Sequence, residues 1–336
     1  GKGIGVVIQG CPPGLEISTS IIQTALDQRK PGSGIAGTTR KEPDTVNILS
    51  GTFEGKTTGT PLTLYIKNKD ARSKSYDSIA SLFRPGHGDY TYQKKYGIRD
   101  YRGGGRASAR ETAARVAAGA VAQILLDTLQ ISIQAYTVCI GGIHAQDLRQ
   151  LDQAMDNDLR CPDPDAAAQM EKRIRQVRKE GDSLGGIVEI VAANVPAGLG
   201  DPVFDKLDAD LAKAIMSIGA VKAVEIGAGV HAAQLTGFEN NDQITPKGFE
   251  TNNAGGILAG ISNGEEIKIR AHVKPIPSIV KNQGTINCEG EKRTISTKGR
   301  HDISAIPRIN KVCEAMTALV LADHLLRQKA IEERRS

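Results

Sequence analysis

The chain has 336 residues, of which 24% are charged, and a formal net charge of +5. It contains no run of about 18 uncharged apolar residues, the length of a membrane-spanning helix, so we predict no membrane partner. Aromatic residues make up only 4% and tryptophan is absent, which disfavours a platform that stacks nucleic-acid bases and predicts no nucleic-acid partner.

The first third of the chain predicts strands, turns and one helix. Apolar patterns indicate strands at 6–8, 46–49 and 62–66, and residues 17–28 have the pattern of a helix. Residues 84–105 have few apolar anchors and many polar and glycine residues, so we expect a long functional loop there.

The rest of the chain predicts more helix than strand. The expected helices span 109–129, 164–180, 208–218 and 311–329, and the expected strands span 186–191 and 221–226. No repeat, low-complexity linker or change in composition divides the chain. We therefore expect residues 1–336 to form a single α+β domain.

The five cysteines are scattered and odd in number. No Cys-x-x-Cys pair or Cys/His cluster has the spacing of a zinc site, so we predict no metal. Reduced thiols are typical of a reducing compartment, which favours a cytoplasmic location.

The strongest local motif is a glycine-rich loop that opens a capped helix, residues 101–112. Its three glycines let the backbone approach a ligand, and Ser108 begins a capping box. A helix start presents unpaired N–H groups, and Arg102 and Arg106 add forked donors suited to phosphate or carboxylate. Seven basic residues and two acidic ones between positions 94 and 115 give a surplus equal to that of the whole chain. The pattern favours an anion site over a flexible turn with a solvated basic face, but it is neither a Walker loop nor a dinucleotide fingerprint.

Two further loops carry candidate acid–base groups. His87 is flanked by glycines on a polar loop, where it could exchange a proton near neutral pH or have only a structural role. Farther along, Arg300 could bind an anion and Asp302 could act as an acid or base. A loop of mixed charge is the alternative for this second segment.

A proline-containing segment at 274–278 is another candidate binding site. Its two prolines fix the directions of Lys274 and Ser278. An edge strand is equally consistent with this pattern.

Taken together, six blocks of the sequence resemble the chorismate synthase family, over essentially the whole chain. The blocks are Gly-Cys-Pro-Pro-Gly (10–14), Phe-Glu-Gly-Lys-Thr-Thr-Gly-Thr-Pro (53–61), Arg-Pro-Gly-His (84–87), Asp-Tyr-Arg-Gly-Gly-Gly-Arg (100–106), Pro-Ala-Gly-Leu-Gly-Asp-Pro-Val-Phe-Asp (196–205) and Thr-Lys-Gly-Arg-His-Asp (297–302). Their common order makes the resemblance specific, whereas no single block would.

The resemblance implies a layered β-α-β sandwich assembled as a homotetramer. It implies a carbon–oxygen lyase that removes phosphate from 5-enolpyruvylshikimate 3-phosphate in an anti-1,4 sense to give chorismate. This reaction is the last step of the shikimate pathway of aromatic amino acid biosynthesis. The cofactor would be FMN in its reduced form, although the reaction has no net redox change. The phosphates and carboxylates of such ligands require a basic, glycine-lined site like the one in this sequence.

Functional residues of the family carry over to matching positions. His87 resembles the histidine that helps to set the protonation of the reduced flavin, and Asp302 resembles the carboxylate that works with the flavin to remove a ring proton. Arg29 and Arg102 match positions that would bind a phosphate of the substrate or of NADP. The matching flavin-binding positions are Arg106, Ala107, Ser108, Gly219, Ala220, Ala259, Lys274, Pro275, Ile276, Pro277, Ser278 and Arg300.

The sequence departs from the family pattern at several positions. The family has Ser-His-Gly near its N-terminus, with the histidine thought to protonate the leaving phosphate. Gly1 matches the glycine, so we expect a chain that is truncated and lacks this histidine. Ile35 replaces a second loop arginine, which predicts weaker anion binding. Gly219 replaces an amide side chain, and Ala259 replaces a glycine and adds a methyl group where the backbone would approach the flavin.

Two other functions fit parts of the sequence. A non-catalytic flavin- or anion-binding protein on the same scaffold would explain the absent histidine and the substituted loop. An RNA-binding module would explain the Arg/Gly loop and the basic pI, but the few aromatic residues and the single basic cluster argue against it.

Overall fold

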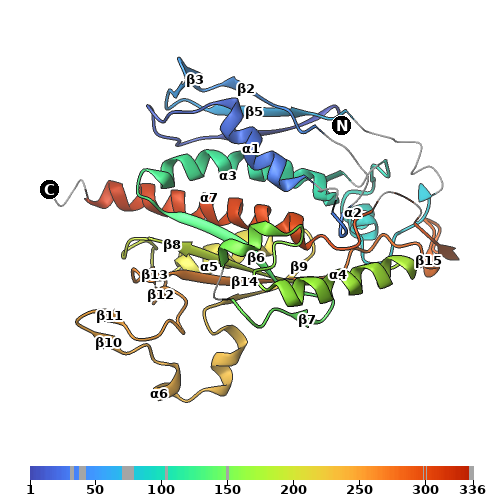
Figure 1. The fold of residues 1–336 in the computed structure, drawn as a ribbon. Helices are drawn as coiled ribbons and strands as arrows, with labels where there is room; N and C mark the ends of the chain where they lie inside the picture. The colour runs from blue at the N-terminus through green and yellow to red at the C-terminus, as the bar shows by residue number, and fades with distance from the viewer. Residues whose placement is uncertain are drawn as a thin grey trace.

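The computed structural model describes residues 1–30, 34–37, 43–69, 79–102, 105–148, 151–297, 299 and 301–332, and the structural statements below concern these residues. Two antiparallel sheets lie on opposite sides of a layer of helices (Figure 1). The mixed α+β class predicted from the sequence is confirmed.

The smaller sheet has three strands, in the order β1 (Gly3–Ile8), β5 (Leu62–Lys67) and β2 (Val46–Ser50). Every second side chain of β5 is buried, because a strand that covers a helix layer with one face requires a period of two. The three strands predicted in this part of the chain are therefore confirmed.

The larger sheet has five strands, in the order β7 (Ile143–His144), β6 (Ser132–Ile140), β8 (Gly186–Ala193), β14 (Ile267–Val273) and β9 (Val221–Ile226). In β14 the apolar side chains are buried, while Lys268, Arg270 and His272 alternate with them on the opposite face. The register of β14 against β8 is regular over all seven residues, without a bulge.

Three helices fill the space between the sheets: α1 (Thr19–Arg29), α3 (Thr112–Asp127) and α7 (Ile306–Glu332) (Figure 1). The alanine-rich sequence of α3 allows it to pack closely along α7. The closest approach is at Gly119, where an added Cβ would lie 2.4 Å from the Cβ of Ala315. The two helices can therefore come this close only because Gly119 has no side chain.

We expect the substitution Gly119→Ala to lower the free energy of unfolding by about 1–3 kcal/mol, because the overpacked helices must move apart. The higher helix propensity of alanine offsets only about 1 kcal/mol of this cost. Denaturant unfolding measures the change. Gly237→Ala is the control, since an added Cβ there meets no atom within 4 Å. Equal stability of the Gly119→Ala variant and the parent would contradict this packing.

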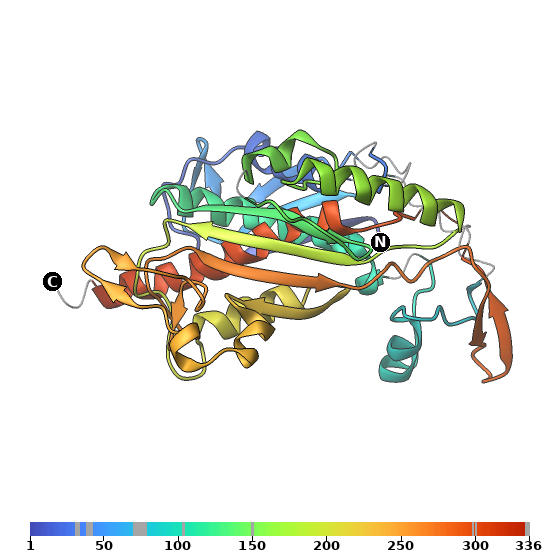
Figure 2. The same cartoon turned by 60° about the horizontal axis from the view of Figure 1, so that its bottom comes forward.

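The remaining elements surround this core. Helix α5 (Leu207–Met216) packs on α7 and β9, and α4 (Pro164–Lys179) packs beside β7. The shorter elements are β3 (Thr52–Phe53), β4 (Lys56–Thr57), α2 (Asp89–Tyr96), α6 (Gly237–Asn240), β10 (Ile244–Thr245), β11 (Gly248–Phe249), β12 (Ile257–Leu258), β13 (Ile261–Ser262), β15 (Gln283–Ile286) and β16 (Lys292–Ile295). Helix α2 and the β15–β16 hairpin project from the body side by side (Figure 2). The segment before α2 is bound to the hairpin, because the backbone N–H of Phe83 donates to the carbonyl of Ile286.

The structure differs from the predicted elements at several places. Helix α2 lies within the segment expected to be a loop, strands β6 and β14 were not predicted, and α7 begins five residues before the expected residue 311. The predicted helix at 109–129 begins with a 3₁₀ turn at Ala109–Glu111, and α3 proper starts at Thr112. Ser108 therefore caps the 3₁₀ turn, because its Oγ accepts from the backbone N–H of Arg110 at 3.2 Å.

None of the described helices is long and apolar enough to span a membrane. Over the same residues, no group of three His, Cys, Asp or Glu side chains could hold a metal ion. All five cysteines are free thiols; Cys139, Cys161 and Cys313 are buried, whereas Cys288 is exposed.

Candidate active site

Three of the predicted functional segments meet at one end of the larger sheet. Lys274, directly after β14, donates from its Nζ to the carbonyl of Gly86 at 2.5 Å. An added Cβ on Gly86 would lie 3.2 Å from the Cβ of Pro277, and one on Gly88 would lie 3.1 Å from the Cβ of Ala107. The His87 loop therefore contacts both the proline segment and the helix-start loop, and the glycines allow the close approach.

The proline segment is not an edge strand, because it lies outside the strands of the sheet. Its Lys274 N–H donates to the carbonyl of Ala220 at 2.9 Å, and the carbonyl of Ile276 accepts from Ser183 Oγ at 2.7 Å. Burial, with a smaller contribution from the charge of Lys222, lowers the pKa of Lys274. Ser278, the last residue of this segment, is also buried.

His87 is mostly buried and is held on one side by charged groups. Its Nδ1 lies 3.0 Å from Asp89 Oδ1 and 3.1 Å from Arg84 Nη2. Burial raises the pKa of Asp89, but hydrogen bonds from Arg84 and His87 outweigh it and hold that pKa well below its usual range. Asp89 is therefore an anion that fixes the imidazole of His87.

His301 and Asp302 follow on a neighbouring segment and carry buried atoms without partners. Asp302 Oδ2 accepts from Arg308 Nη1 at 2.6 Å, whereas Oδ1 is buried and has no partner among the described residues. His301 Nε2 is also buried without such a partner. Burial and the charge of Arg84 lower the pKa of His301, although Asp302 opposes them. A buried polar atom without a partner is costly unless a ligand satisfies it, so these atoms mark a candidate ligand site.

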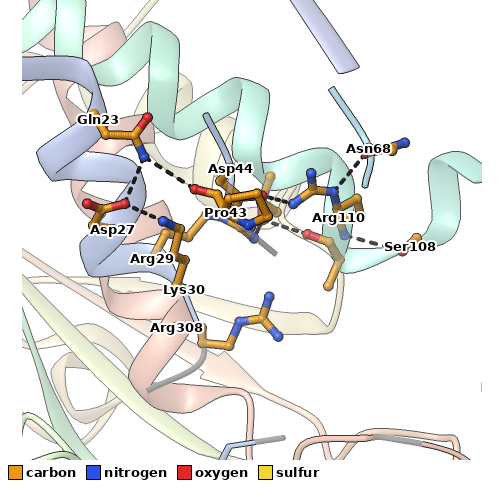
Figure 3. Close-up of polar contacts among 12 residues, drawn as sticks. Gln23, Asp27, Arg29, Lys30, Pro43, Asp44, Asn68, Ser108, Arg110 and Arg308 are labelled. Atoms are coloured by element: carbon orange, nitrogen blue, oxygen red, sulfur yellow. Dashed lines mark hydrogen bonds and ion pairs between the residues drawn. The ribbon is translucent and has the colours of Figure 1, made fainter. Parts of the chain in front are cut away.

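An arginine cluster, drawn in Figure 3, lies next to this segment, because its Arg308 binds Asp302. Arg29, at the end of α1 and 2% exposed, donates from Nη2 to Asp44 Oδ2 at 2.7 Å. Arg110 is bound to Asp44 Oδ1, and Arg308 reaches toward the cluster from α7. Burial and then the charge of Arg308 lower the pKa of Arg29 to about 10, although Asp44 raises it.

The cluster retains unused hydrogen-bond donors. Arg29 Nε and Arg110 Nη2 are buried and have no acceptor among the described residues. Asp44 is completely buried and is the shared counter-ion of Arg29 and Arg110. Guanidinium groups with free N–H donors and excess positive charge are suited to phosphate and carboxylate groups.

The four arginines predicted to bind anions differ in their surroundings. Arg29 is not on the surface of the loop that follows α1 but is held inside, donating also to Thr112 Oγ1 at 3.2 Å. Arg102 is exposed and donates to Asp100 at 2.9 Å. Arg106 is exposed and makes no hydrogen bond or ion pair with the described residues. Arg300 lies outside the described residues.

The predicted flavin positions on either side of α5 are separated. Gly219 and Ala220 follow the C-terminal end of α5 and lie beside Lys274. Ala259 lies at the other end, where the carbonyl of Gly260 accepts from the N–H of Leu207. A ten-residue helix is about 15 Å long, so one chain does not bring Ala259 to the other positions. Ala259 has φ of +51°, a conformation in which glycine is favoured.

Sequence reasoning did not assign functions to Arg84, Asp89, Asp44, Arg110 or Arg308. Arg84 and Asp89 could have been found, since they flank His87 within three residues on either side. The pairing of Asp44 with arginines from α1 and from the 3₁₀ turn before α3 has no local signal, because it depends on how these segments fold together.

Comparison with known proteins agrees with this arrangement. The family model described as chorismate synthase matches residues 1–326. The chain belongs to the chorismate synthase family.

Individual relatives are similar over nearly the whole chain. The chorismate synthase of Desulfosudis oleivorans is 65% identical over 334 residues, which cover 98% of this chain and 94% of that protein. The chorismate synthase of Desulfatibacillum aliphaticivorans is 62% identical over 331 residues, with 98% and 92% covered. A crystal structure of a chorismate synthase superposes with a TM-score of 0.78 at 35% identity and covers 98% of this chain and 89% of that one. Membership of the chorismate synthase family makes this chain a carbon–oxygen lyase.

The chorismate synthase family implies a flavin cofactor, and the residues of the site fit one. A flavin ring presents N–H and carbonyl groups along its edge, and His301 Nε2 is a buried atom that needs such a partner. Arg106 and Lys274 supply positive charge next to the glycine contacts described above.

Proposed function

We propose that this chain catalyses the anti-1,4-elimination of phosphate from 5-enolpyruvylshikimate 3-phosphate to give chorismate, with FMN in its reduced form. The observation that carries this proposal is a set of buried atoms without partners among the described residues: the donors Arg29 Nε and Arg110 Nη2, and the acceptor Asp302 Oδ1. Arg308 links them, because it binds Asp302 and its charge acts on Arg29. The donors suit an anionic leaving group, and the carboxylate suits a proton that must be removed.

The arginine cluster would bind and orient the anionic substrate. Arg29 and Arg110 are each bound to Asp44, so their remaining N–H groups are already fixed in position before the ligand binds. Arg308 adds positive charge from α7 and also holds Asp302. These fixed donors would stabilise the phosphate as it leaves with the electron pair of the carbon–oxygen bond.

Asp302 would accept the ring proton that is lost, and His87 would hold a proton next to the cofactor. Because Arg308 binds Oδ2, the second oxygen of Asp302 is free to accept the proton. Reduced FMN, when bound, supplies the electron-rich ring that assists loss of phosphate without net redox change. His87, Arg106, Ala107, Ser108, Gly219, Ala220 and residues 274–278 would surround it, with Arg300 as a further ligand. Ala259 would reach such a site only from another copy of the chain.

The position of Gly1 supports the role that the family resemblance gives to the preceding histidine. Asn68 Nδ2 donates to the carbonyl of Gly1 at 2.9 Å, and Asn68 Oδ1 accepts from Arg110 Nε at 3.1 Å. A histidine directly before Gly1 would therefore lie near Arg110 and a phosphate bound there. From that position it would protonate the leaving phosphate.

We also propose the remaining properties of the family for this chain. They are a single layered β-α-β sandwich domain over 1–336, a homotetramer, and a cytoplasmic location. Arg29 and Arg102 would contact a phosphate of the substrate or of NADP, with Arg29 as part of the arginine cluster and Arg102 from the surface loop.

The substitution Arg110→Met tests the assignment of the arginine cluster. We expect it to weaken binding of 5-enolpyruvylshikimate 3-phosphate by about 10- to 100-fold, the cost of losing charge-assisted hydrogen bonds. Isothermal titration calorimetry measures this change. Arg175→Met is the matched control, because among the described residues Arg175 pairs only with Glu171, on the exposed face of α4. Unchanged substrate affinity in a folded Arg110→Met variant would contradict the assignment.

A further inference from the structure

Asp89 is a buried carboxylate to which the mechanism above gives no role. It is the first residue of α2, is 5% exposed and lies next to His87 in space. Its Oδ1 is 3.0 Å from His87 Nδ1. A histidine can present either ring nitrogen as the donor, and the partner of one nitrogen decides which form is present.

The Asp89 carboxylate is fixed from several sides. Arg84 donates to it through Nε and Nη2, each at 2.8 Å, and through its backbone N–H at 3.1 Å. Arg99 Nη1 lies 3.3 Å from the same carboxylate, while Arg99 Nη2 donates to backbone carbonyls, including that of Leu82 at 2.7 Å. Asp89 therefore cannot rotate away from His87 without breaking a forked ion pair.

Two partners compete for His87 Nδ1. Asp89 Oδ1 can accept a proton from this nitrogen, whereas Arg84 Nη2, at 3.1 Å, can only donate to it. Arg84 Nη2 already donates to Asp89, so it gains little from a second bond to a neutral imidazole. With the proton on Nε2 instead, the lone pair of Nδ1 would face the anionic Asp89 oxygen at 3.0 Å and repel it, whereas a proton on Nδ1 makes a charge-assisted hydrogen bond there, which favours the form with a proton on Nδ1.

We propose that Asp89 is a positioning residue that keeps the proton of His87 on Nδ1 and leaves Nε2 as the nitrogen that exchanges a proton at the active site. This inference rests on the role proposed above for His87. Asp89 acts only through His87 and does not touch the substrate. Arg84 and Arg99 maintain the geometry, since they hold the carboxylate in one orientation.

The tautomer of His87 can be measured without catalysis. The two ring nitrogens of histidine have different ¹⁵N chemical shifts when protonated and unprotonated, so a ¹⁵N-histidine-labelled chain reports the proton position. The His87 signals are assigned by their loss in His87→Gln. We expect a protonated Nδ1 and an unprotonated Nε2 in the neutral ring, with and without FMN. A neutral ring protonated on Nε2 would overturn the proposal, and this result requires no variant of Asp89.

The substitution Asp89→Asn tests the functional consequence. Asparagine has nearly the same size but is a weaker acceptor, so the donor Arg84 gains access to Nδ1 and the proton shifts toward Nε2. We expect kcat to fall by about 10- to 100-fold, as when an outer partner that orients a histidine is removed. The KM for substrate and the affinity for reduced FMN should stay within about threefold, because Asp89 touches neither. Asp89→Glu should restore part of kcat if it restores the Nδ1–H form.

The control is Glu171→Gln, another exchange of a carboxylate for an amide, at an exposed ion pair on α4. It should leave both the His87 signals and kcat unchanged. A fall in kcat without a change of tautomer in Asp89→Asn would reduce Asp89 to a structural residue and overturn the inference. If neither the parent chain nor a version with Ser-His ahead of Gly1 turns over although each binds FMN, the proposed function fails, while the tautomer measurement still decides the role of Asp89.

Discussion

The substitution Asp302→Asn is expected to lower kcat by about 10²- to 10⁴-fold, the usual contribution of a positioned general base. Asp302 has one oxygen bound by Arg308 and the other buried without a partner among the described residues. Asparagine retains the size of the side chain but cannot accept the ring proton. Chorismate formation under anaerobic conditions with reduced FMN measures kcat, and substrate affinity should change by only a few fold.

Asp323→Asn is the matched control, because Asp323 lies on α7, the helix that also carries Arg308, and pairs with Arg327 at the surface. It should leave kcat unchanged. If Asp302→Asn retained more than about a tenth of the parent kcat, Asp302 would not be the group that removes the proton.

The substitution Asp44→Asn is expected to lower the free energy of unfolding by about 3–5 kcal/mol. It removes the shared counter-ion of Arg29 and Arg110 and leaves two guanidinium groups with uncompensated charge in the interior. Denaturant unfolding near pH 7 measures the loss. Asp27→Asn is the control on α1, since Asp27 is exposed and its partner Lys30 can be solvated, so its cost should stay below about 1 kcal/mol.

The stability difference between the parent and Asp44→Asn should depend on pH. Burial raises the pKa of Asp44, but the charges and hydrogen bonds of Arg29 and Arg110 outweigh it and hold that pKa below the usual value. A carboxylate with a lowered pKa in the folded state contributes stability above its unfolded pKa and loses that contribution as the pH falls through the folded value. The difference between parent and variant should therefore shrink below about pH 4. A difference that stays constant down to pH 2 would contradict the ion-pair assignment.

The fold could be predicted where one face of an element is buried. Strand β5 and the helices α1 and α4 have the periods that such burial requires, and they were predicted within a few residues. Strand β14 has the same clear alternation and could also have been found. Strand β6 could not, because its last six residues are all buried, and a continuous apolar run is as consistent with a buried helix.

Helix α2 illustrates a limit of local pattern. Its sequence is polar and rich in tyrosine, so neither propensity nor periodicity indicates a helix. Contacts with the residues just before it hold it: Asp89 binds Arg84, and Tyr90 packs edge-on against Phe83 at a centroid distance of 5.5 Å. Its position depends on contacts that form only in the folded chain.

Only part of the candidate site could be predicted from the sequence, because the rest depends on contacts that form in the folded chain. His87, Asp302 and Lys274 lie on short motifs with proline, glycine and charged residues, which are visible in the sequence. The arginine cluster was only partly visible, because its counter-ion Asp44 is one residue among many in a polar stretch before β2. Burial turns this aspartate into the residue that organises two distant arginines.

The most direct test of the central claim is turnover itself. The chain is mixed anaerobically with reduced FMN and 5-enolpyruvylshikimate 3-phosphate, and chorismate absorbance and free phosphate are followed together. It is compared with a version that carries Ser-His ahead of Gly1, where the added histidine would lie near Arg110. We expect the extended chain to release chorismate and phosphate in equal amounts. Absence of both products from both chains, although each binds reduced FMN, would contradict the assignment and favour a non-catalytic flavin-binding protein.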